Sequence, residues 1–483
     1  MSRFKKILLG IVVFVLATAG LFVVVIGPWP VYTDSHFATS AYCKKALADI
    51  DKNVALSDFT ASPGTLKAGW GTAKMTPKVG TPLGGLGARR GRPSVGVHDD
   101  LYAKAICLSD GKDTVALIGD DMLIVPPNIA ELALKKIALE VPLTSNNILF
   151  CASHTHSGTG AFAPGLAGYF SSGKYDPAVP ELVGTAMADA VIAAYKSMAP
   201  AKLADGQVDA PEFIRNRART ATTDTMLKYL AVEKLTGEKC FVIRYSAHPT
   251  IFGTSNMRFS AEFPGALQRY VEAETKGTAI YLGGAVGSMG PNAPDAPTAD
   301  ERVDLMGKGL ARKMLDALAA APPQFKTNLD IASVGVPVGM PPAQMRPLGP
   351  GFRVSPLIVK LAGLRAEGWV QGIRVGDILF VGLPYDASGE LARQWREEMA
   401  PKGWDLWVHG FSSAYCGYLT PDKYYYEVDK DGKLGYENGL MSWFGPNAEA
   451  YMRTLRDEII NKMGASPLRA QNGAPLKAAT AAS

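Results

Sequence analysis

Apolar and polar positions follow two kinds of pattern along most of the chain. Short apolar runs predict buried strands at residues 114–119, 147–152, 241–246, 279–282, 328–338, 372–374, 378–381 and 405–409. Longer segments with apolar residues every three or four positions predict helices at residues 41–51, 128–139, 180–198, 264–274, 300–321, 388–399 and 447–463. Because the two kinds of element alternate, the sequence predicts an α/β fold.

The N-terminus departs from this pattern. Three basic residues within the first six positions precede an uncharged run over residues 7–29, which is long enough to span a bilayer as a helix. A cleavable signal peptide is the alternative, but its apolar stretch would be about 7–15 residues long, and the A-x-A match at residues 17–19 lies inside the run. We therefore predict an uncleaved signal anchor over residues 1–30. The positive-inside rule then places the rest of the chain outside the cytoplasm, in the periplasm if the source is bacterial.

The remaining sequence suggests how the chain is organised. Residues 31–66 are mixed and polar, which predicts a linker, and residues 67–465 form the predicted catalytic body. Two adjacent prolines predict a possible subdomain seam near residues 322–327. Residues 340–356 are rich in Pro, Gly and Met without a period and predict a surface loop. The tail at 466–483 has no acidic residue and little to bury, so we expect it to be disordered.

Charge and cysteine content narrow the class of protein. The 50 basic and 45 acidic residues are spread along the chain without a basic stripe, which argues against a nucleic-acid partner. Five scattered cysteines do not form a disulfide framework or a CxxC metal motif, and an odd number leaves at least one thiol free. Cys107 and Cys151 lie in apolar runs and are expected to be buried.

Histidines offer the first candidate chemistry. His154 and His156 follow an apolar strand, and in extended chain residues two apart point to the same side. His248 follows another buried strand and precedes a proline that halts it. Three imidazoles at strand ends would suit zinc, whereas hydrogen-bonded histidines that cap strands are the alternative interpretation. His98 and His409 are weaker candidates.

Two downstream segments are less specific. Asp386 and Ser388 stand where a strand ends and a helix begins, so helix capping explains them as well as a site does. The Gly-rich loop at 282–292 brings backbone close to the contents of a cleft. It lacks the Lys-Ser/Thr end of a P-loop, and Ser288 has no G-x-S-x-G surroundings that would favour it as a nucleophile.

Taken in order, the motifs resemble the neutral, non-lysosomal ceramidase family over residues 68–465. The string Ser153-His154-Thr155-His156-Ser157-Gly158 is the most specific. The other matching segments are 96–105, 119–122, 216–217, 247–250, 287–292, 383–386, 415–420 and 436–437.

The resemblance implies a catalytic domain with mixed central sheets and flanking helices, and a zinc amidase that cleaves ceramide to a fatty acid and a sphingoid base. Matched residue by residue, it implies the zinc ligands His154, His248, Asp386 and Tyr418. It also implies that His156 and Arg217 contact the reacting amide and that Tyr436 hydrogen-bonds near the developing oxyanion.

Two positions depart from the family pattern. Gly290 occupies the position of the family's proposed nucleophilic serine, and a glycine has no side chain with which to attack. Asp386 replaces a glutamate that is one methylene longer. We expect the loop with Ser288, Gly290 and Asn292 to contact substrate, and zinc-activated water to replace the serine as nucleophile.

The sequence thus predicts a membrane-anchored, extracytoplasmic zinc hydrolase of amide-linked acyl groups, with Zn²⁺ as cofactor and a lipid or N-acyl amide as substrate. A non-catalytic lipid- or metal-binding protein, or an esterase or amidase for another acyl substrate, are the alternatives. The loop at 340–357 offers Met340, Met345 and Leu357 as apolar groups that could enter the bilayer.

Overall fold

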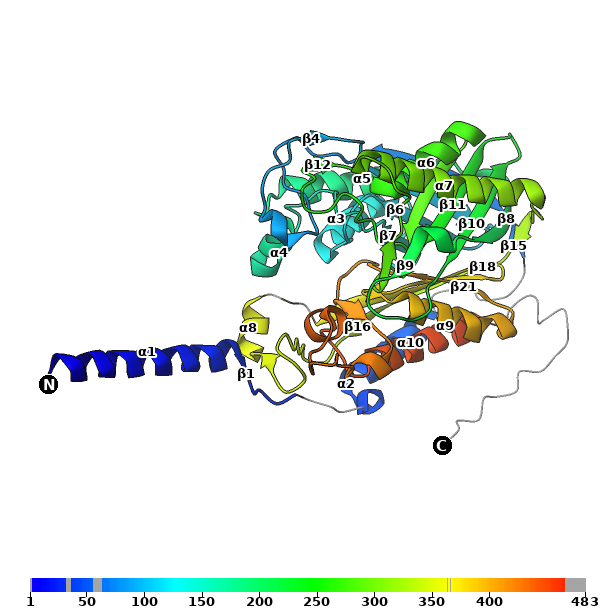
Figure 1. Cartoon of the computed structure of the whole chain (residues 1–483). Helices are drawn as coiled ribbons and strands as arrows, with labels where there is room; N and C mark the ends of the chain where they lie inside the picture. Colours follow the sequence, from blue (N-terminus) through cyan, green and yellow to red (C-terminus); the bar gives the residue numbers. More distant parts are fainter. Residues whose placement is uncertain (1, 32–35, 55–62, 363, 365, 465–483) are drawn as a thin grey trace.

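The strands read as continuous apolar runs because both faces of the sheets are covered. In β5 (Tyr102–Ser109), Ala105 and Cys107 belong to a core on one face of the sheet, while Ile106 and Leu108 belong to a core on the other face. The computed structural model describes residues 2–31, 36–54, 63–362, 364 and 366–464. Its body stacks helices, a large sheet, a smaller sheet and further helices (Figure 1), so the predicted α/β fold with mixed sheets and flanking helices is confirmed.

The large sheet has eight strands within the described residues, in the order β13-β11-β10-β8-β3-β5-β6-β7. Their bounds are β3 (Lys67–Lys74), β5 (Tyr102–Ser109), β6 (Thr114–Asp120), β7 (Ile148–Ala152), β8 (Ala199–Asp209), β10 (Met226–Lys234), β11 (Lys239–Tyr245) and β13 (Thr278–Gly283). The pairs β6–β7 and β11–β13 are parallel, and the remaining neighbours are antiparallel.

Four long helices cover the outer face of the large sheet. They are α3 (Pro127–Glu140), α5 (Ala178–Lys196), α6 (Glu262–Thr275) and α7 (Ala299–Ala320). α7 begins with a capping box, in which the Thr298 side chain accepts from the Glu301 amide and the Glu301 side chain accepts from the Thr298 amide. The side chains of α5 and α3 pack on β3, β5 and β6, and those of α6 and α7 pack on β10, β11 and β13.

The smaller sheet lies against the inner face of the large one. It has the order β16-β18-β19-β21, with bounds β16 (Ile331–Gly339), β18 (Glu367–Val375), β19 (Ile378–Gly382) and β21 (Asp405–His409). Leu117 and Leu149 of the large sheet meet Phe380 and Trp407 of the smaller one in a shared core. The helices α2 (Ala41–Val54), α9 (Gly389–Met399) and α10 (Ala448–Lys462) cover the other face.

Short paired strands complete the description. They are β1 (Ile26–Gly27) with β17 (Arg353–Val354), β2 (Gly64–Thr65) with β15 (Asn328–Leu329), β4 (Gly96–Val97) with β12 (Arg258–Phe259), β9 (Ile214–Asn216) with β14 (Met289–Pro291), and β20 (Asp386–Ala387) with β22 (Tyr418–Leu419). Two short helices, α4 (Gly165–Ser172) and α8 (Pro356–Leu361), lie on the side of the body that faces α1 (Arg3–Val25) (Figure 1).

Every long helix predicted in the body is present, and each predicted strand position lies in a strand or overlaps one within a few residues. The prediction of a surface loop over 340–356 is partly wrong: Met340, Ala343 and Arg346 are buried, and residues 353–354 form β17. Apolar packing on α2 and α10 buries this segment instead of leaving it on the surface. The predicted tail at 466–483 lies outside the described residues.

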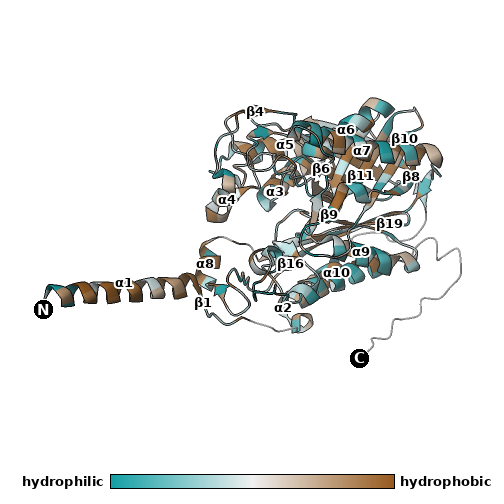
Figure 2. Cartoon of the chain, in the orientation of Figure 1, coloured by the Kyte–Doolittle hydropathy of each residue, from teal (hydrophilic) through white to brown (hydrophobic). Residues whose placement is uncertain are grey.

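Beyond its basic first turn, the N-terminal helix α1 is apolar (Figure 2), and none of its residues is buried. Its 23 residues make a helix about 35 Å long, enough to cross a bilayer core of about 30 Å. α5 also passes a length and hydropathy test for a membrane span, but more than half of it is buried in the core. α1 is therefore a possible anchor or signal sequence, and α5 is a core helix.

A buried ion cluster joins the two sheet layers. The carboxylate of Asp224 accepts from Arg244 of β11 at 2.8 Å and from Arg396 of α9 at 2.7 Å, and Ser246 donates to it at 2.8 Å. Although burial raises it, the charges of Arg244 and Arg396 hold the pKa of Asp224 well below its usual range. The cluster therefore stabilises the fold at neutral pH.

We predict that Asp224→Asn lowers the free energy of unfolding by about 3–5 kcal/mol at pH 7, because two guanidinium groups lose their buried counter-charge. A carboxylate with a lowered pKa stabilises the fold above its unfolded pKa of about 3.9, so the difference between wild type and variant should shrink as the pH falls below about 4. Denaturant titrations followed by circular dichroism measure both effects.

The matched control is Asp316→Asn, which removes an exposed i,i+4 partner of Arg312 and should leave the unfolding midpoint unchanged. An Asp224→Asn variant as stable as this control would show that the cluster does not join the layers.

Candidate functional site

Two glycines bring the strands that carry the site together. A Cβ on Gly119 of β6 would lie 2.2 Å from the carbonyl oxygen of Tyr281, and a Cβ on Gly283 would lie 2.2 Å from that of Ala152. Without side chains at these positions, β13 can approach β6 and β7, although it stands at the opposite end of the strand order. The carboxyl ends of β7, β11 and β13 therefore meet in one place.

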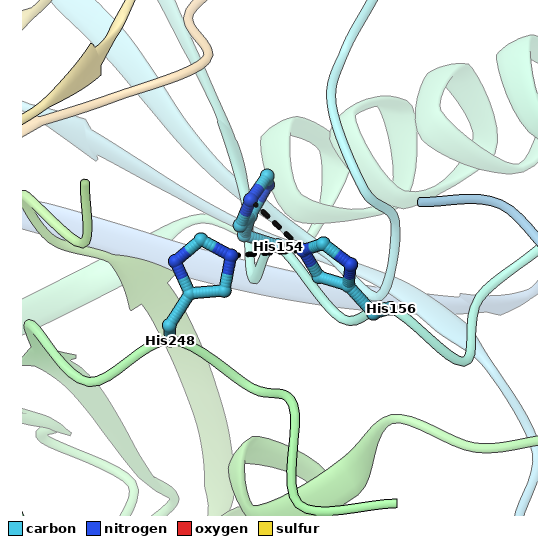
Figure 3. Close-up of side chains that lie close together, drawn as sticks. All are labelled: His154, His156 and His248. Carbon is cyan, nitrogen blue, oxygen red and sulfur yellow. Dashed lines mark hydrogen bonds between the residues drawn. The ribbon is translucent and has the colours of Figure 1, made fainter. Parts of the chain in front are cut away.

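Three imidazoles converge there (Figure 3). His154 and His156 lie in the loop after β7, and His248 follows β11. The Nε2 atom of His156 lies 2.8 Å from Nε2 of His248 and 3.2 Å from Nε2 of His154. All three side chains point toward one another.

The prediction that His154 and His156 lie on extended backbone is wrong. His154 has φ of 65°, in the left-handed region, and does not continue the extended strand. Its ring stacks on Phe411, with ring centres 4.0 Å apart and planes within 7°. A left-handed turn braced by an aromatic ring, rather than an extended strand, aims the two histidines inward.

Two of the three histidines have fixed tautomers. Nδ1 of His154 donates to the carbonyl of Leu123 at 2.5 Å, and Nδ1 of His248 donates to that of Val286 at 3.3 Å. Their Nε2 atoms then carry lone pairs, whereas Nδ1 of His156 has no hydrogen-bond partner among the described residues. Burial lowers the pKa of His154 to about 3 and those of His156 and His248 well below the usual value, so all three rings are neutral.

A carboxylate completes the cluster. Asp386, in β20, is fully buried and has an oxygen 3.9 Å from Nε2 of His154. Burial raises the pKa of Asp386 to about 8, while Arg217 and Tyr418 act in the opposite direction. Neither carboxylate oxygen has a hydrogen-bond partner among the described residues. The β20–β22 pairing sets Asp386 opposite Tyr418.

This donor set fits a divalent metal ion. Nε2 of His156 can donate to only one of the two Nε2 lone pairs beside it, and the buried Asp386 oxygens lack a hydrogen-bond partner among the described residues. Such groups are unfavourable alone, and a cation would satisfy them. A carbonyl that accepts from Nδ1 of a metal-binding histidine is the usual outer support of such a ligand. The support of His154 and His248 by the carbonyls of Leu123 and Val286 suits these two residues as ligands.

Arg217 and Tyr436 stand at the open side of the cluster. The guanidinium of Arg217 donates to the carbonyl of Gly287 at 2.9 Å and to the hydroxyl of Tyr418 at 2.9 Å. Tyr436 is 61% exposed, and its ring lies edge-on to that of Tyr418 with centres 6.2 Å apart. Arg217 and Tyr436 line a cavity of about 450 Å³, which can admit a ligand.

The Gly-rich loop is held more tightly than the sequence suggests. The Ser288 hydroxyl is buried, donates to Glu390 and accepts from the Gly389 amide at 3.1 Å. The exposed Asn292 amide donates to the carbonyl of Glu212 at 2.7 Å. These two side chains are engaged in the fold, and the structure does not place them with the three histidines.

Gly290 has room for a side chain. Its position in β14 has ordinary backbone geometry, and a Cβ there would meet nothing closer than the Cβ of Arg217, at 3.5 Å. The absence of a serine hydroxyl at this position is therefore not forced by packing.

A second, apolar cavity of about 420 Å³ approaches the histidines from the side of α4. Phe162, Tyr415 and Trp443 are among the residues that line it. The Tyr415 ring stacks with Phe411, which in turn stacks on His154. The apolar cavity thus lies two rings away from the candidate metal ligands.

Several contributors were not predicted. Arg89 is buried and donates to the carbonyl of His156, and Glu390 accepts from Ser288, Asn216 and Arg219. Arg89 lies far from the histidines in sequence and shows no local pattern. Glu390 follows Asp386 in the first turn of α9. An acidic residue is common at a helix start, so the sequence does not distinguish its contacts with Ser288, Asn216 and Arg219.

Comparison with known proteins relates this arrangement to one family. Residues 67–281 match the family model for neutral/alkaline non-lysosomal ceramidase, N-terminal. The resemblance stated from the motifs is confirmed. No match is found among curated proteins.

Two solved structures share the fold. A neutral ceramidase from Pseudomonas aeruginosa is 16% identical with a TM-score of 0.70, and covers 87% of this chain and 77% of its own. A structure described as "Ceramidase complexed with C2" is 15% identical with a TM-score of 0.69 and has the same coverage. At these identities the likeness shows the fold.

We predict that His154→Ala and His248→Ala each lose the bound metal, whereas His156→Ala keeps it with an affinity reduced by at most about 10- to 100-fold. Elemental analysis of purified full-length protein measures the content, which should be about one ion per chain in the wild type. The matched control is His98→Ala, whose ring pairs with Asp99 at 2.6 Å.

Full metal content in both His154→Ala and His248→Ala would rule out the site. An equal loss in His156→Ala would replace the ligand set with three histidines.

Proposed function

We propose that this chain is a zinc-dependent hydrolase of an N-acyl lipid amide, held to the membrane by its N-terminal helix. The match of residues 67–281 to the family model for neutral/alkaline non-lysosomal ceramidase supports the proposal. Ceramide or a related lipid is the proposed substrate, and a fatty acid and an amine are the products. The observation that carries the proposal is the convergence of His154, His248 and the unpartnered Asp386.

His154, His248, Asp386 and Tyr418 would hold the zinc ion. Imidazole nitrogen and carboxylate oxygen are donors that zinc accepts in catalytic sites. When bound, zinc supplies a Lewis acid that polarises a carbonyl and lowers the pKa of water toward about 7.

The open side of the cluster would bind the reacting amide. Arg217, fixed by the Gly287 carbonyl and the Tyr418 hydroxyl, presents a cation beside the cavity. Tyr436 brings a phenol to the same cavity. Both groups can donate hydrogen bonds to an oxygen that becomes negative during the reaction.

The nucleophile in this proposal is water. Water forms the new C–O bond, the amide C–N bond breaks, and the amine leaves with a proton. His156 would take the proton from water and return it to the amine nitrogen. This route suits a chain with Gly290 at the family's serine position and with the Ser288 hydroxyl engaged by Glu390.

The membrane part of the proposal rests on α1. An apolar helix with no buried residue and a basic N-terminal flank is suited to a signal anchor. Such an anchor would hold the body on the extracytoplasmic side, where it meets lipid substrates.

We predict that the purified full-length protein releases fatty acid from an N-acyl sphingoid base carrying a fluorescent acyl chain, and that His154→Ala lowers kcat/KM at least about 10³-fold. His98→Ala serves as the control and should keep wild-type activity. Hydrolysis of an ester analogue without the amide would favour an esterase. Zinc-loaded wild type that cleaves neither would leave a non-catalytic binding protein.

We also predict that no acyl-enzyme forms. Intact-protein mass spectrometry of samples quenched during turnover should show an unmodified chain, and Ser288→Ala should keep kcat within about tenfold of wild type. Gly290→Ser, which the backbone can accommodate, is the informative comparison because it supplies the missing hydroxyl. An acyl adduct on Ser288 in the wild type would overturn the water route.

A further inference from the structure

Two short helices expose apolar side chains that the core does not use. On α4, Leu166, Tyr169 and Phe170 are 52–64% exposed. On α8, Leu357 and Leu361 are 55% and 66% exposed. We refer to these five side chains as the apolar rim. Clustered exposed apolar groups mark a binding surface more often than scattered ones do.

The two helices flank one cavity. Ala167, Gly168 and Ser171 of α4 line the apolar cavity of about 420 Å³, and so do Ala362 and Leu364, which follow α8. The apolar rim therefore lies beside the mouth of this cavity, whose lining residue Tyr415 stacks with Phe411. Met340 is buried, so the expectation that it enters the bilayer is wrong. Met345 is half-buried in the lining of this cavity, and Leu357 is exposed as expected.

The anchor helix is attached directly beside this mouth. Ile26 and Gly27 of β1 pair with Val354 and Arg353 of β17, two residues before α8 begins. The Ser355 amide donates to the carbonyl of Val25, the last residue of α1, at 2.9 Å. α8 thus lies at the level where the membrane-spanning stretch ends, and α4 lies on the same side of the body (Figure 1).

We refer to the paired strands β1 and β17 as the β1–β17 clamp. The turn that leads from α1 into this clamp requires a glycine. A Cβ on Gly27 would lie 2.6 Å from the carbonyl oxygen of Val23. The chain can therefore turn from α1 into β1 without a spacer. The nearby Trp29 donates to the Val23 carbonyl at 2.9 Å, at a depth where tryptophan is favoured in membranes.

The charges of the two helices suit a bilayer surface. The sequences of α4, GLAGYFSS, and α8, PLIVKL, contain no acidic residue, and Lys360 is exposed on α8. Apolar side chains with a nearby lysine are typical of segments that lie in the headgroup region.

We propose that the apolar rim docks into the outer leaflet, held there by the β1–β17 clamp, so that a lipid passes from the bilayer into the apolar cavity without crossing water. The inference rests on the membrane anchor of the proposed function and adds a fixed orientation of the body. The occupant is the lipid bilayer, because the rim is continuous with the helix that spans it.

The docking can be measured without any turnover. All five native cysteines are buried, so a cysteine introduced at an exposed position can be labelled selectively. We would label Phe170→Cys and Leu361→Cys in full-length protein with an environment-sensitive fluorophore and reconstitute it into phosphatidylcholine vesicles. Leu235→Cys, 68% exposed in the turn between β10 and β11, is the matched control.

Brominated phosphatidylcholine should quench the labels at 170 and 361 at least about twofold more than the label at 235. Equal quenching at all three positions would overturn the proposal. Crosslinking between labels at 170 of two chains, without lipid quenching, would identify a second copy as the occupant and would also overturn it.

Turnover gives an independent readout. The combined variant Leu166→Ser, Phe170→Ser and Leu361→Ser should lower kcat/KM about tenfold on ceramide in vesicles and change it less than about twofold on a short-chain, soluble N-acyl amide. Leu235→Ser should affect neither substrate. Equal losses on both substrates would assign the rim to folding or to the cavity.

Failure of the proposed function looks different. Protein that hydrolyses no amide but shows quenching at 170 and 361 retains the docking inference and loses the enzymatic one. Protein that hydrolyses the soluble amide without selective quenching loses the docking inference alone.

Discussion

The site depends on the close approach of β13 to β6 and β7. β13 lies at the opposite end of the strand order, and side chains at positions 119 and 283 would keep it away. With glycine at both, the carboxyl ends of the two parallel pairs meet, and loops that follow different strands share one space. Polar side chains gathered at such a place are buried by the sheets beneath them. The neutral state of the three histidines and the raised pKa of Asp386 follow from that burial.

The sequence predicts most of the fold because burial on both faces leaves a strong signal. β6 and β7 are apolar at nearly every position, and the long helices have clear periods. Of the strands of the large sheet that the pattern did not predict, β3, β5, β8 and β10, two have an interrupted apolar pattern. β3 contains Gly69 and Gly71, whose missing side chains let α5 pack on the sheet: a Cβ there would lie 2.2 Å and 2.4 Å from α5 carbonyls. β8 contains Lys202, Asp205 and Asp209, so it is not a continuous apolar run. Packing partners, which hydropathy does not encode, decide such segments.

In the candidate site too, some residues could be predicted from local sequence and others could not. His154, His156 and His248 are rare residues in distinctive strings, so they could be found locally. Asp386 and Tyr418 needed the family resemblance, because helix capping and aromatic packing explain them equally well in the sequence. The carbonyls of Leu123 and Val286, which set the two tautomers, could not be predicted at all, since any residue supplies a carbonyl. These two atoms fix the Nε2 lone pairs of His154 and His248, the two histidines that the resemblance implies as ligands.

The candidate metal-site residues are present in this chain, whereas the family's serine is replaced by Gly290. Two buried features are unfavourable unless a ligand satisfies them. They are the Nε2 lone pairs of the carbonyl-supported histidines and the carboxyl group of Asp386. In a protein without a metal site, an apolar residue at position 386 would remove the unfavourable burial of this carboxyl group. The serine position, in contrast, is glycine although its backbone has room for a side chain. Unfavourable groups beside a glycine that has room for a side chain support the proposal of a cation site that works without a serine nucleophile.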